Sequence, residues 1–229
     1  MIKSRLDRAV ASIAFDDFAQ NSWTVGGQIL QAASVRGTYF VSGSYCGREA
    51  HGIKYFEADD LVAAHANGHE VACHTFDHRT VSGLSPGEIE ATLRQNQDFV
   101  RSLLGDVVMT SFAFPHGETS IRTKRILSRH FAACRGVFPG INSGRIDLSE
   151  LKAVELAPYV LKSYSIDRMI EAALANRGWL IIVGHDVANV HSPYGCTPRV
   201  LETAVSKLLA AKIEILPIKN ALGRAAFVQ

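Results

Sequence analysis

The sequence has no long hydrophobic run, no closely paired cysteines and no block of basic residues. No stretch reaches the roughly 20 apolar residues that a membrane-spanning helix needs, so we do not expect a transmembrane segment. Lysine and arginine total 24 and aspartate and glutamate 22, and the net charge is only +2. Because these charges are mixed along the chain, we do not expect binding to nucleic acid.

The four cysteines, at positions 46, 73, 134 and 196, lie far apart and form no CxxC pair. This spacing favours neither a zinc finger nor a disulfide framework. Residues 1–10 carry charges throughout and lack the apolar segment of a signal peptide. We therefore expect a cytoplasmic protein whose cysteines are reduced and mostly buried.

Apolar segments of strand length alternate with amphipathic segments of helix length along all 229 residues. The expected strands are 12–15, 38–41, 70–73, 111–114, 131–134, 154–156, 179–183 and 213–216. The expected helices are the second half of 21–35, then 57–66, 85–104, 120–129, 165–176 and 197–211, and the segment 42–55 is expected to be a loop. Such alternation predicts a parallel sheet with helices outside. Seven or eight units in one α/β domain, residues 1–229, favour a closed or nearly closed barrel.

Polar residues follow several of these strands directly: Asp16 and Asp17, His74, Pro115 and His116, and His185. Barrels of this class place their active sites at the carboxyl ends of the strands. We therefore expect these side chains to meet at one end of the barrel.

His74 and His78 stand four residues apart, and a helical turn after the strand would place them on one face. Two imidazoles and one carboxylate, from Asp16 or Asp17, can hold a divalent metal with positions left for water and substrate. The other aspartate would lie beside the metal as the base. The alternative is a structural histidine pair and an Asp-Asp turn that caps a helix.

In this order the motifs resemble those of polysaccharide deacetylases of the NodB-homology class (carbohydrate esterase family 4), over about residues 12–222. The segment 15–17 is similar to the first motif, which supplies the base and one metal ligand, here Asp16 and Asp17. The segment 74–78 is similar to the second, which supplies both metal histidines. The resemblance implies a distorted (β/α)7-type barrel and a divalent metal, with Zn expected and Co, Ni or Mn as alternatives.

The segment 112–117 resembles the third motif, a wall of the substrate groove, in which Pro115 precedes a backbone N–H of His116 that would stabilise the oxyanion. The segment 182–186 resembles the fifth motif and implies that His185 is the general acid. Asp186 would orient His185 or cap the next loop.

Three departures from the family pattern concern groups around the site. Ala113 occupies the place of an arginine that orients the catalytic aspartate. His116 replaces an aromatic residue, and Phe18 follows the aspartates where glycine is common. No clear counterpart of the fourth motif, whose aspartate supports the catalytic histidine, is visible, and 159–167 is the expected region.

Two aromatic residues are candidates for substrate contact. Trp23 would offer a stacking surface to a sugar or merely pack a helix, and Tyr194 lies on the long segment 187–198, either a substrate lid or an ordinary connection. The expected function is metal-dependent removal of an acyl group, acetyl first, from an N-acylated sugar, such as a precursor of a cell-surface polysaccharide or lipopolysaccharide. The alternatives are a metal hydrolase of a small non-sugar C–N amide bond and a non-catalytic carbohydrate-binding relative.

Overall fold

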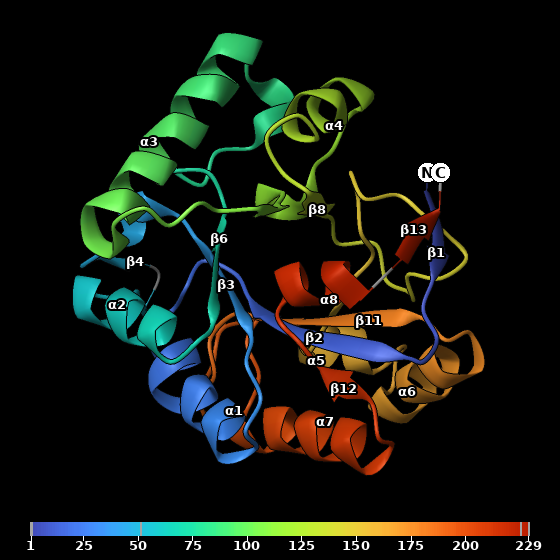
Figure 1. Cartoon of the computed structure of the whole chain (residues 1–229). Coiled ribbons are helices and arrows are strands. Elements are labelled where there is room, and N and C mark those ends of the chain that lie inside the picture. Colours follow the sequence, from blue (N-terminus) through green and yellow to red (C-terminus); the bar gives the residue numbers. More distant parts are fainter. Residues whose placement is uncertain (1, 51, 225, 229) are drawn as a thin grey trace.

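Eight short strands form one curved parallel sheet at the centre of the computed structural model, which describes residues 2–50, 52–224 and 226–228 (Figure 1). Seven strands run in the order β10-β11-β2-β3-β6-β7-β8, and β12 pairs with the first half of β2. Their bounds are β2 Val10–Phe15, β3 Thr38–Val41, β6 Glu70–Cys73, β7 Ser111–Ala113, β8 Ala133–Arg135, β10 Val154–Glu155, β11 Trp179–Gly184 and β12 Glu214–Ile215. Nearly all of their residues are buried, as expected for parallel strands covered on both faces.

Helices surround this sheet and cover its outer face (Figure 1). The outer helices are α1 Gln28–Ala32, α2 Ala58–Ala66, α3 Pro86–Leu104, α4 Ile121–Leu127, α5 Pro158–Leu161, α6 Ile166–Ala175 and α7 Pro198–Ala210, and a further helix, α8 Ile218–Arg224, lies on the inner face. The predicted start of α3 is a capping box, in which Ser85 and Glu88 each accept a hydrogen bond from the other's backbone N–H. The curved sheet and its outer helices confirm the predicted fold class.

Small residues line the inner face of the sheet. Ala14, Ala72, Ala113 and Ala133 belong to one buried cluster with Phe40 and Trp179, and residues of α8 complete it. The Trp179 indole donates to the hydroxyl of Ser12 at 2.9 Å. The sequence analysis did not predict α8, which packs across this inner face close to β2 (Figure 1).

The segment 148–156 pairs with the edge strand β8 near its start and includes the other edge strand, β10, near its end. The Leu151 N–H donates to the Cys134 carbonyl at 2.8 Å, and the Leu156 N–H donates to the Val183 carbonyl of β11 at 2.8 Å. One irregular segment thus links both sides of the sheet, and the barrel is nearly closed.

Smaller elements complete the chain. A second sheet has the order β13-β1-β9, from β13 Ala226–Val228, β1 Ile2–Arg5 and β9 Arg145–Ile146, and it brings the two ends of the chain together (Figure 1). The segment 42–55, expected to be a loop, contains the hairpin of β4 Glu49–Ala50 and β5 Ile53–Lys54. The segment 21–35 was expected to be helical in its second half, where α1 lies, and its first half also forms a helical turn, the π-helix η1 Ser22–Gly27. None of the helices described is long and apolar enough to cross a membrane.

Candidate active site

Loops at one end of the barrel bring together most of the polar residues singled out in the sequence. Asp16 and Asp17 follow β2, His74 and His78 follow β6, and His185 follows β11. Because all these strands are parallel, their carboxyl ends meet at the same edge. The predicted position of the site at this end follows directly from the sheet order.

The two histidines are not on a helix, so the predicted helical spacing was wrong. After β6 the chain continues as an irregular loop, in which Thr75 and His78 have φ of 61° and 53°. These left-handed residues reverse the chain and point both imidazoles at Asp17. The spacing of four residues therefore reflects a tight loop and not one face of a helix.

Left-handed backbone conformations gather around this end of the barrel. Asp17 and Phe18 have φ of 62° and 54°, and His116 has φ of 57°. Residues with a Cβ atom adopt this region rarely, at an energy of about 1–3 kcal/mol each. Such strain accumulates at functional sites because the surrounding structure holds the side chains in a required arrangement.

Asp17, His74 and His78 present one ligand atom each to a common point, and these atoms lie within 4.8 Å of one another. Oδ1 of Asp17 is 3.1 Å from Nε2 of His78 and 3.5 Å from Nε2 of His74. Two imidazole nitrogens and one carboxylate oxygen are ligands that suit zinc and related transition metals.

The hydrogen bonds around this triad test whether a cation fits there. Nδ1 of His74 lies 2.9 Å from the carbonyl of Ala113, so Nδ1 must carry the proton in the neutral ring. Nε2 then presents a lone pair toward Oδ1 of Asp17, a buried atom that accepts no well-aligned hydrogen bond. Lone pairs that converge without a proton between them fit a divalent cation.

The protonation states agree with such a site. Burial lowers the pKa of His74 to about 4, so the ring is neutral near pH 7 and available as a ligand. Burial opposes ionisation of Asp17, but the neighbouring imidazoles of His78 and His74 hold the pKa of its carboxyl well below the usual value.

Asp16 is buried beside an arginine that the sequence analysis did not identify. One terminal nitrogen of Arg135, at the end of β8, lies 2.5 Å from each carboxylate oxygen of Asp16. Burial opposes ionisation, but the Arg135 guanidinium, with His74 and His185, keeps the pKa of Asp16 below its ordinary value. Asp16 is therefore an ionised carboxylate held in a fixed orientation.

Arg135 explains the apparent loss of the family arginine at Ala113. The two residues are direct partners on the neighbouring strands β7 and β8. A small side chain at 113 leaves room for the guanidinium, which also lies 5.1 Å from the ring centre of Phe40. In the sequence, Arg135 directly follows the predicted strand 131–134, whereas in the structure it is the last residue of β8.

His185 faces Asp16 from the other side, with Nε2 at 4.0 Å from Oδ2. Its buried Nδ1 has no hydrogen-bond partner among the residues described. Asp186 does not orient it, because both Asp186 oxygens accept hydrogen bonds from Ser192. Asp167, in the region expected to hold the fourth motif, instead pairs with Lys207 on the exposed surface.

The rim of the site contains further predicted residues. The exposed His116 ring lies 4.5 Å from that of His78, and Pro115 before it is buried. Tyr194, on the 187–198 segment, lies 5.7 Å from the His185 ring and is 55% exposed. The rings of Tyr194 and His116 thus remain accessible beside the candidate metal ligands and the candidate acid.

Trp23 packs a helix, the second of its two predicted roles, and is not a stacking surface at the site. Its ring packs edge-on against Tyr39 and His69 at 6.2 and 5.5 Å. His69 precedes β6, whereas His74 follows it, so Trp23 lies toward the opposite end of the barrel and packs η1 against the sheet.

A tyrosine pair was missed because it lies in a segment expected to be a simple loop. Tyr45 stacks on Tyr55 at 4.3 Å and lies 5.6 Å from the His78 ring. Burial, followed by the Asp17 carboxylate, raises the pKa of both phenols, so both are neutral. This pair forms an aromatic wall beside the candidate metal ligands.

Comparison with known proteins agrees with this geometry. The family model described as polysaccharide deacetylase matches residues 3–132. No curated protein sequence matches the chain. Among solved structures, the T48 deacetylase, determined with substrate, has a TM-score of 0.66 and 17% identity over 96% of this chain and 94% of that one.

Two further structures show the range of proteins with this fold. A family 4 acetyl xylan esterase from Clostridium thermocellum, in complex with a cobalt ion, has a TM-score of 0.62 and 19% identity over 93% of this chain and 90% of its own. BA3943, a pseudoenzyme of carbohydrate esterase family 4 from Bacillus anthracis, has a TM-score of 0.67 and 15% identity over 97% and 68%. At these identities the likeness establishes the fold.

Proposed function

Because the chain belongs to the polysaccharide deacetylase family, we propose that it is a metal-dependent hydrolase that removes an acetyl group from an N-acetylated sugar. The observation that carries this proposal is the convergence of Asp16, the Asp17–His74–His78 triad and His185 at one end of the barrel. A precursor of a cell-surface polysaccharide or lipopolysaccharide is the proposed source of the sugar.

Asp17, His74 and His78 would hold the metal, and zinc is our assignment because imidazole and carboxylate ligands suit it. When bound, a divalent cation there supplies Lewis-acid activation of water and of the amide carbonyl group. The Ala113 carbonyl fixes the tautomer of His74 so that Nε2 faces the metal position.

Asp16 is the proposed general base. Its carboxylate is ionised and held by Arg135, so its oxygens keep one orientation while a water proton is transferred to Oδ2. His185 faces the same oxygen at 4.0 Å and would protonate the leaving nitrogen. The base and the acid thus flank one reaction position from opposite sides.

The remaining assignments rest on likeness to the family. The backbone N–H of His116, in its left-handed turn after Pro115, would donate to the developing oxyanion. Tyr194 offers an exposed ring next to His185 on which a sugar face can stack.

A second candidate function is sugar binding without turnover. It is favoured by one observation: Nδ1 of His185 has no partner among the described residues to fix its tautomer or support its positive charge. One protein with the same fold is also described as a pseudoenzyme.

Release of acetate from N-acetyl sugars by the zinc-loaded protein separates these functions. We expect release by the wild type and a loss of about 10²–10⁴-fold in Asp16→Asn, with the metal retained, because only the base is removed. Sugar binding with no acetate release would favour the second candidate. Hydrolysis of small non-sugar amides alone would contradict both.

His185→Ala refines the assignment of the acid. An aryl acetate ester has a leaving group that needs no protonation, so this variant should retain far more activity on the ester than on the amide. Equal losses on both substrates would show that His185 is not the general acid.

A further inference from the structure

The large exposed apolar side chains of this protein gather at one end of the barrel. Of the eleven among the described residues, six lie in the segments that leave the carboxyl ends of four strands: Ile121 after β7, Val137 and Phe138 after β8, Tyr159 after β10, and Val190 and Tyr194 after β11. We call these six side chains the apolar rim. Others stand elsewhere, such as Val108 before β7 and Leu174 on α6.

The four strands that carry the apolar rim are consecutive around the barrel. β10 and β11 are neighbours at one edge of the sheet, and β7 and β8 are neighbours at the other. The segment 148–156 pairs with β8 and continues into β10, so it joins these two edges. The apolar rim therefore occupies one continuous side of the carboxyl end.

Contacts place the apolar rim beside the proposed catalytic groups. The Tyr159 ring lies 6.4 Å from the Tyr194 ring, which in turn lies 5.7 Å from His185. Val137 packs against Gly117, where an added Cβ atom would lie 2.3 Å from a methyl carbon of the valine. The apolar rim thus borders the opening of the site.

The proposed reaction does not account for this much exposed apolar surface. The Val190 side chain is 93% exposed and the Phe138 ring 61% exposed, and neither has a role in the proposed chemistry. Apolar side chains that gather on the surface around a functional opening indicate an interaction surface.

The charged groups of the same segments leave an excess of positive charge. Their acidic side chains already have partners: Asp147 and Glu150 pair with Lys124, Glu155 with the Tyr159 hydroxyl, Asp186 with Ser192, and Glu118 with Ser82. Lys152 and Lys162 are exposed, and neither forms an ion pair with a described residue.

The two lysines lie next to aromatic members of the apolar rim. Lys152 precedes Ala153, whose N–H donates to the Phe138 carbonyl at 3.0 Å. Lys162 ends α5 in a helical conformation, three residues after Tyr159 and therefore on the same face. Apolar rings and unpaired positive charges thus alternate along this side of the barrel.

This combination matches the surface of an anionic lipid bilayer. Tyrosine rings suit the headgroup layer because one edge is apolar and the other polar, and lysines are attracted to the lipid phosphates. A protein bound to the apolar rim would cover the opening of the site. A bilayer that carries the substrate would instead present it to that opening.

We propose that the carboxyl end of the barrel docks on an anionic lipid bilayer through the apolar rim, Lys152 and Lys162, and that the N-acetylated sugar is presented on a lipid of that bilayer. The part that concerns the sugar rests on the proposed function, whereas the docking does not.

Sedimentation with lipid vesicles tests the docking. The zinc-loaded full chain would be mixed with vesicles of phosphatidylcholine, or of phosphatidylcholine and phosphatidylglycerol in a two-to-one ratio. We expect the wild type to bind the anionic vesicles at least about tenfold more strongly, because each lysine near an anionic surface adds a factor of roughly five.

Two double variants separate the apolar and the charged contributions. Phe138→Ser/Val190→Ser should weaken binding to both kinds of vesicle by about tenfold, because apolar surface no longer enters the headgroup layer. Lys152→Gln/Lys162→Gln should weaken binding to the anionic vesicles alone, also by about tenfold. Both variants should release acetate from a soluble N-acetyl sugar within about twofold of wild type.

Matched controls make the same changes away from the apolar rim. Val108→Ser/Leu174→Ser removes two other exposed apolar side chains, and Arg94→Gln/Arg101→Gln removes two exposed charges from α3. Both controls should bind vesicles like the wild type.

A fluorescence measurement covers the case in which the serine variant does not fold. Phe138→Trp should be quenched by brominated acyl chains beyond the quenching of the wild type, whereas Val108→Trp should not.

Absence of vesicle binding by the wild type, or equal losses in the rim variants and their controls, would overturn the docking. A dimer that Phe138→Ser/Val190→Ser abolishes, without vesicle binding, would assign the apolar rim to a second copy and also overturn it. Rim-dependent vesicle binding with no acetate release would support the docking and contradict the proposed hydrolysis. Acetate release from a soluble sugar without vesicle binding would do the reverse.

Discussion

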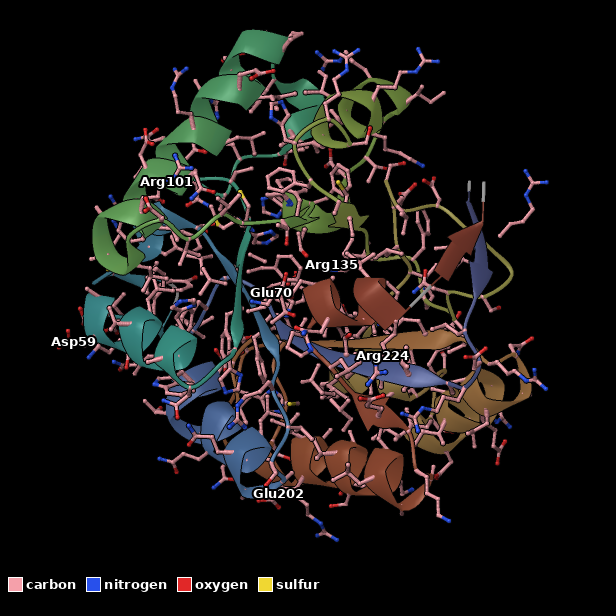
Figure 2. The ribbon with its side chains drawn as sticks, in the orientation of Figure 1. Asp59, Glu70, Arg101, Arg135, Glu202 and Arg224 are labelled. Carbon is pink, nitrogen blue, oxygen red and sulfur yellow. The ribbon has the colours of Figure 1, made fainter. Side chains whose placement is uncertain are left out.

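The two ends of the barrel each bury a carboxylate, but they treat it differently. At the amino ends of the strands, Glu70 accepts hydrogen bonds from the Thr38 hydroxyl, the Ser111 hydroxyl and the Lys219 N–H at 2.7–2.9 Å. At the carboxyl ends, Asp16 and Asp17 meet an arginine and two histidines. Figure 2 shows Glu70 and Arg135 near the centre of the molecule, inside the ring of helices.

The two ends differ in how many of their buried polar atoms lack a hydrogen-bond partner. Glu70 is held by neutral donors from β3, β7 and α8, which leave it no role except joining those elements. Five buried side-chain atoms lack hydrogen-bond partners in the described structure, and four of them lie at the carboxyl end: Oδ1 of Asp17, the hydroxyl of Thr75, Nε of Arg135 and Nδ1 of His185. The fifth, Nε2 of His69, lies at the amino end. Unpaired polar groups are costly to bury, so their concentration at one end marks the place where a ligand completes the structure.

Removal of a proposed metal ligand should have the largest effect on the carboxyl end of the barrel. His78→Ala should lower zinc content to below about a tenth of stoichiometric and reduce hydrolysis by more than about 10³-fold, because two ligands cannot replace three. Circular dichroism should show an intact fold, since His78 lies in a loop outside the sheet. Stoichiometric zinc in the purified variant would disprove the metal site.

Arg135→Ala should have the second largest effect on activity, and it should also lower stability. It leaves the Asp16 carboxylate buried without its partner, and we expect a loss of about 3–5 kcal/mol of unfolding free energy together with reduced activity. The double variant Ala113→Arg/Arg135→Ala returns the arginine to the neighbouring strand at the same level. It should recover activity and stability relative to Arg135→Ala, and failure to recover either would show that the two positions are not equivalent.

Glu70→Gln tests the amino end of the barrel, and it should lower stability with little change in activity. An amide offers one acceptor oxygen where the carboxylate offers two, so we expect a loss of about 1–2 kcal/mol in urea unfolding. Acetate release should stay within about twofold of wild type, because no Glu70 contact reaches the site. A large drop in rate at full folding would mean that the two ends are coupled.

His69 predicts a pH dependence of stability that does not involve the site. Burial, with Arg36 adding to it, lowers the pKa of His69 from 6.5 to about 4. Between these values the unfolded chain binds a proton that the folded chain does not, so this residue lowers stability as the pH falls. From pH 7 to pH 5 the effect is about 2 kcal/mol.

His69→Gln keeps an acceptor for the Gly37 N–H, which His69 receives on Nδ1 at 3.0 Å. Urea unfolding of both proteins at pH 7 and pH 5 tests this. On going from pH 7 to pH 5, the wild type should lose about 2 kcal/mol more unfolding free energy than the variant. A constant difference would mean that His69 is already protonated in the folded protein at pH 5.

Alternating apolar segments were enough to predict the parallel sheet, because its strands are short and buried and four of the helices begin at a side-chain cap, at Ser85, Ser120, Ser165 and Thr197. The same order placed Asp17, His74 and His78 at one end. The sequence could not show that Arg135 substitutes at Ala113, since that pairing depends on which strands are neighbours in space. Nor could it show the left-handed turns at Thr75 and His78, which no glycine marks.

Arg135 also lies at the seam of the barrel, which gives the closure of the sheet a chemical consequence. Its strand is an edge strand, and its own backbone pairs with Leu151 of the bridging segment. Any opening of this seam would let the guanidinium withdraw and release the Asp16 carboxylate from its fixed orientation. The catalytic rate would then depend on whether the seam is closed. Mild denaturant should therefore abolish turnover before the helices unfold.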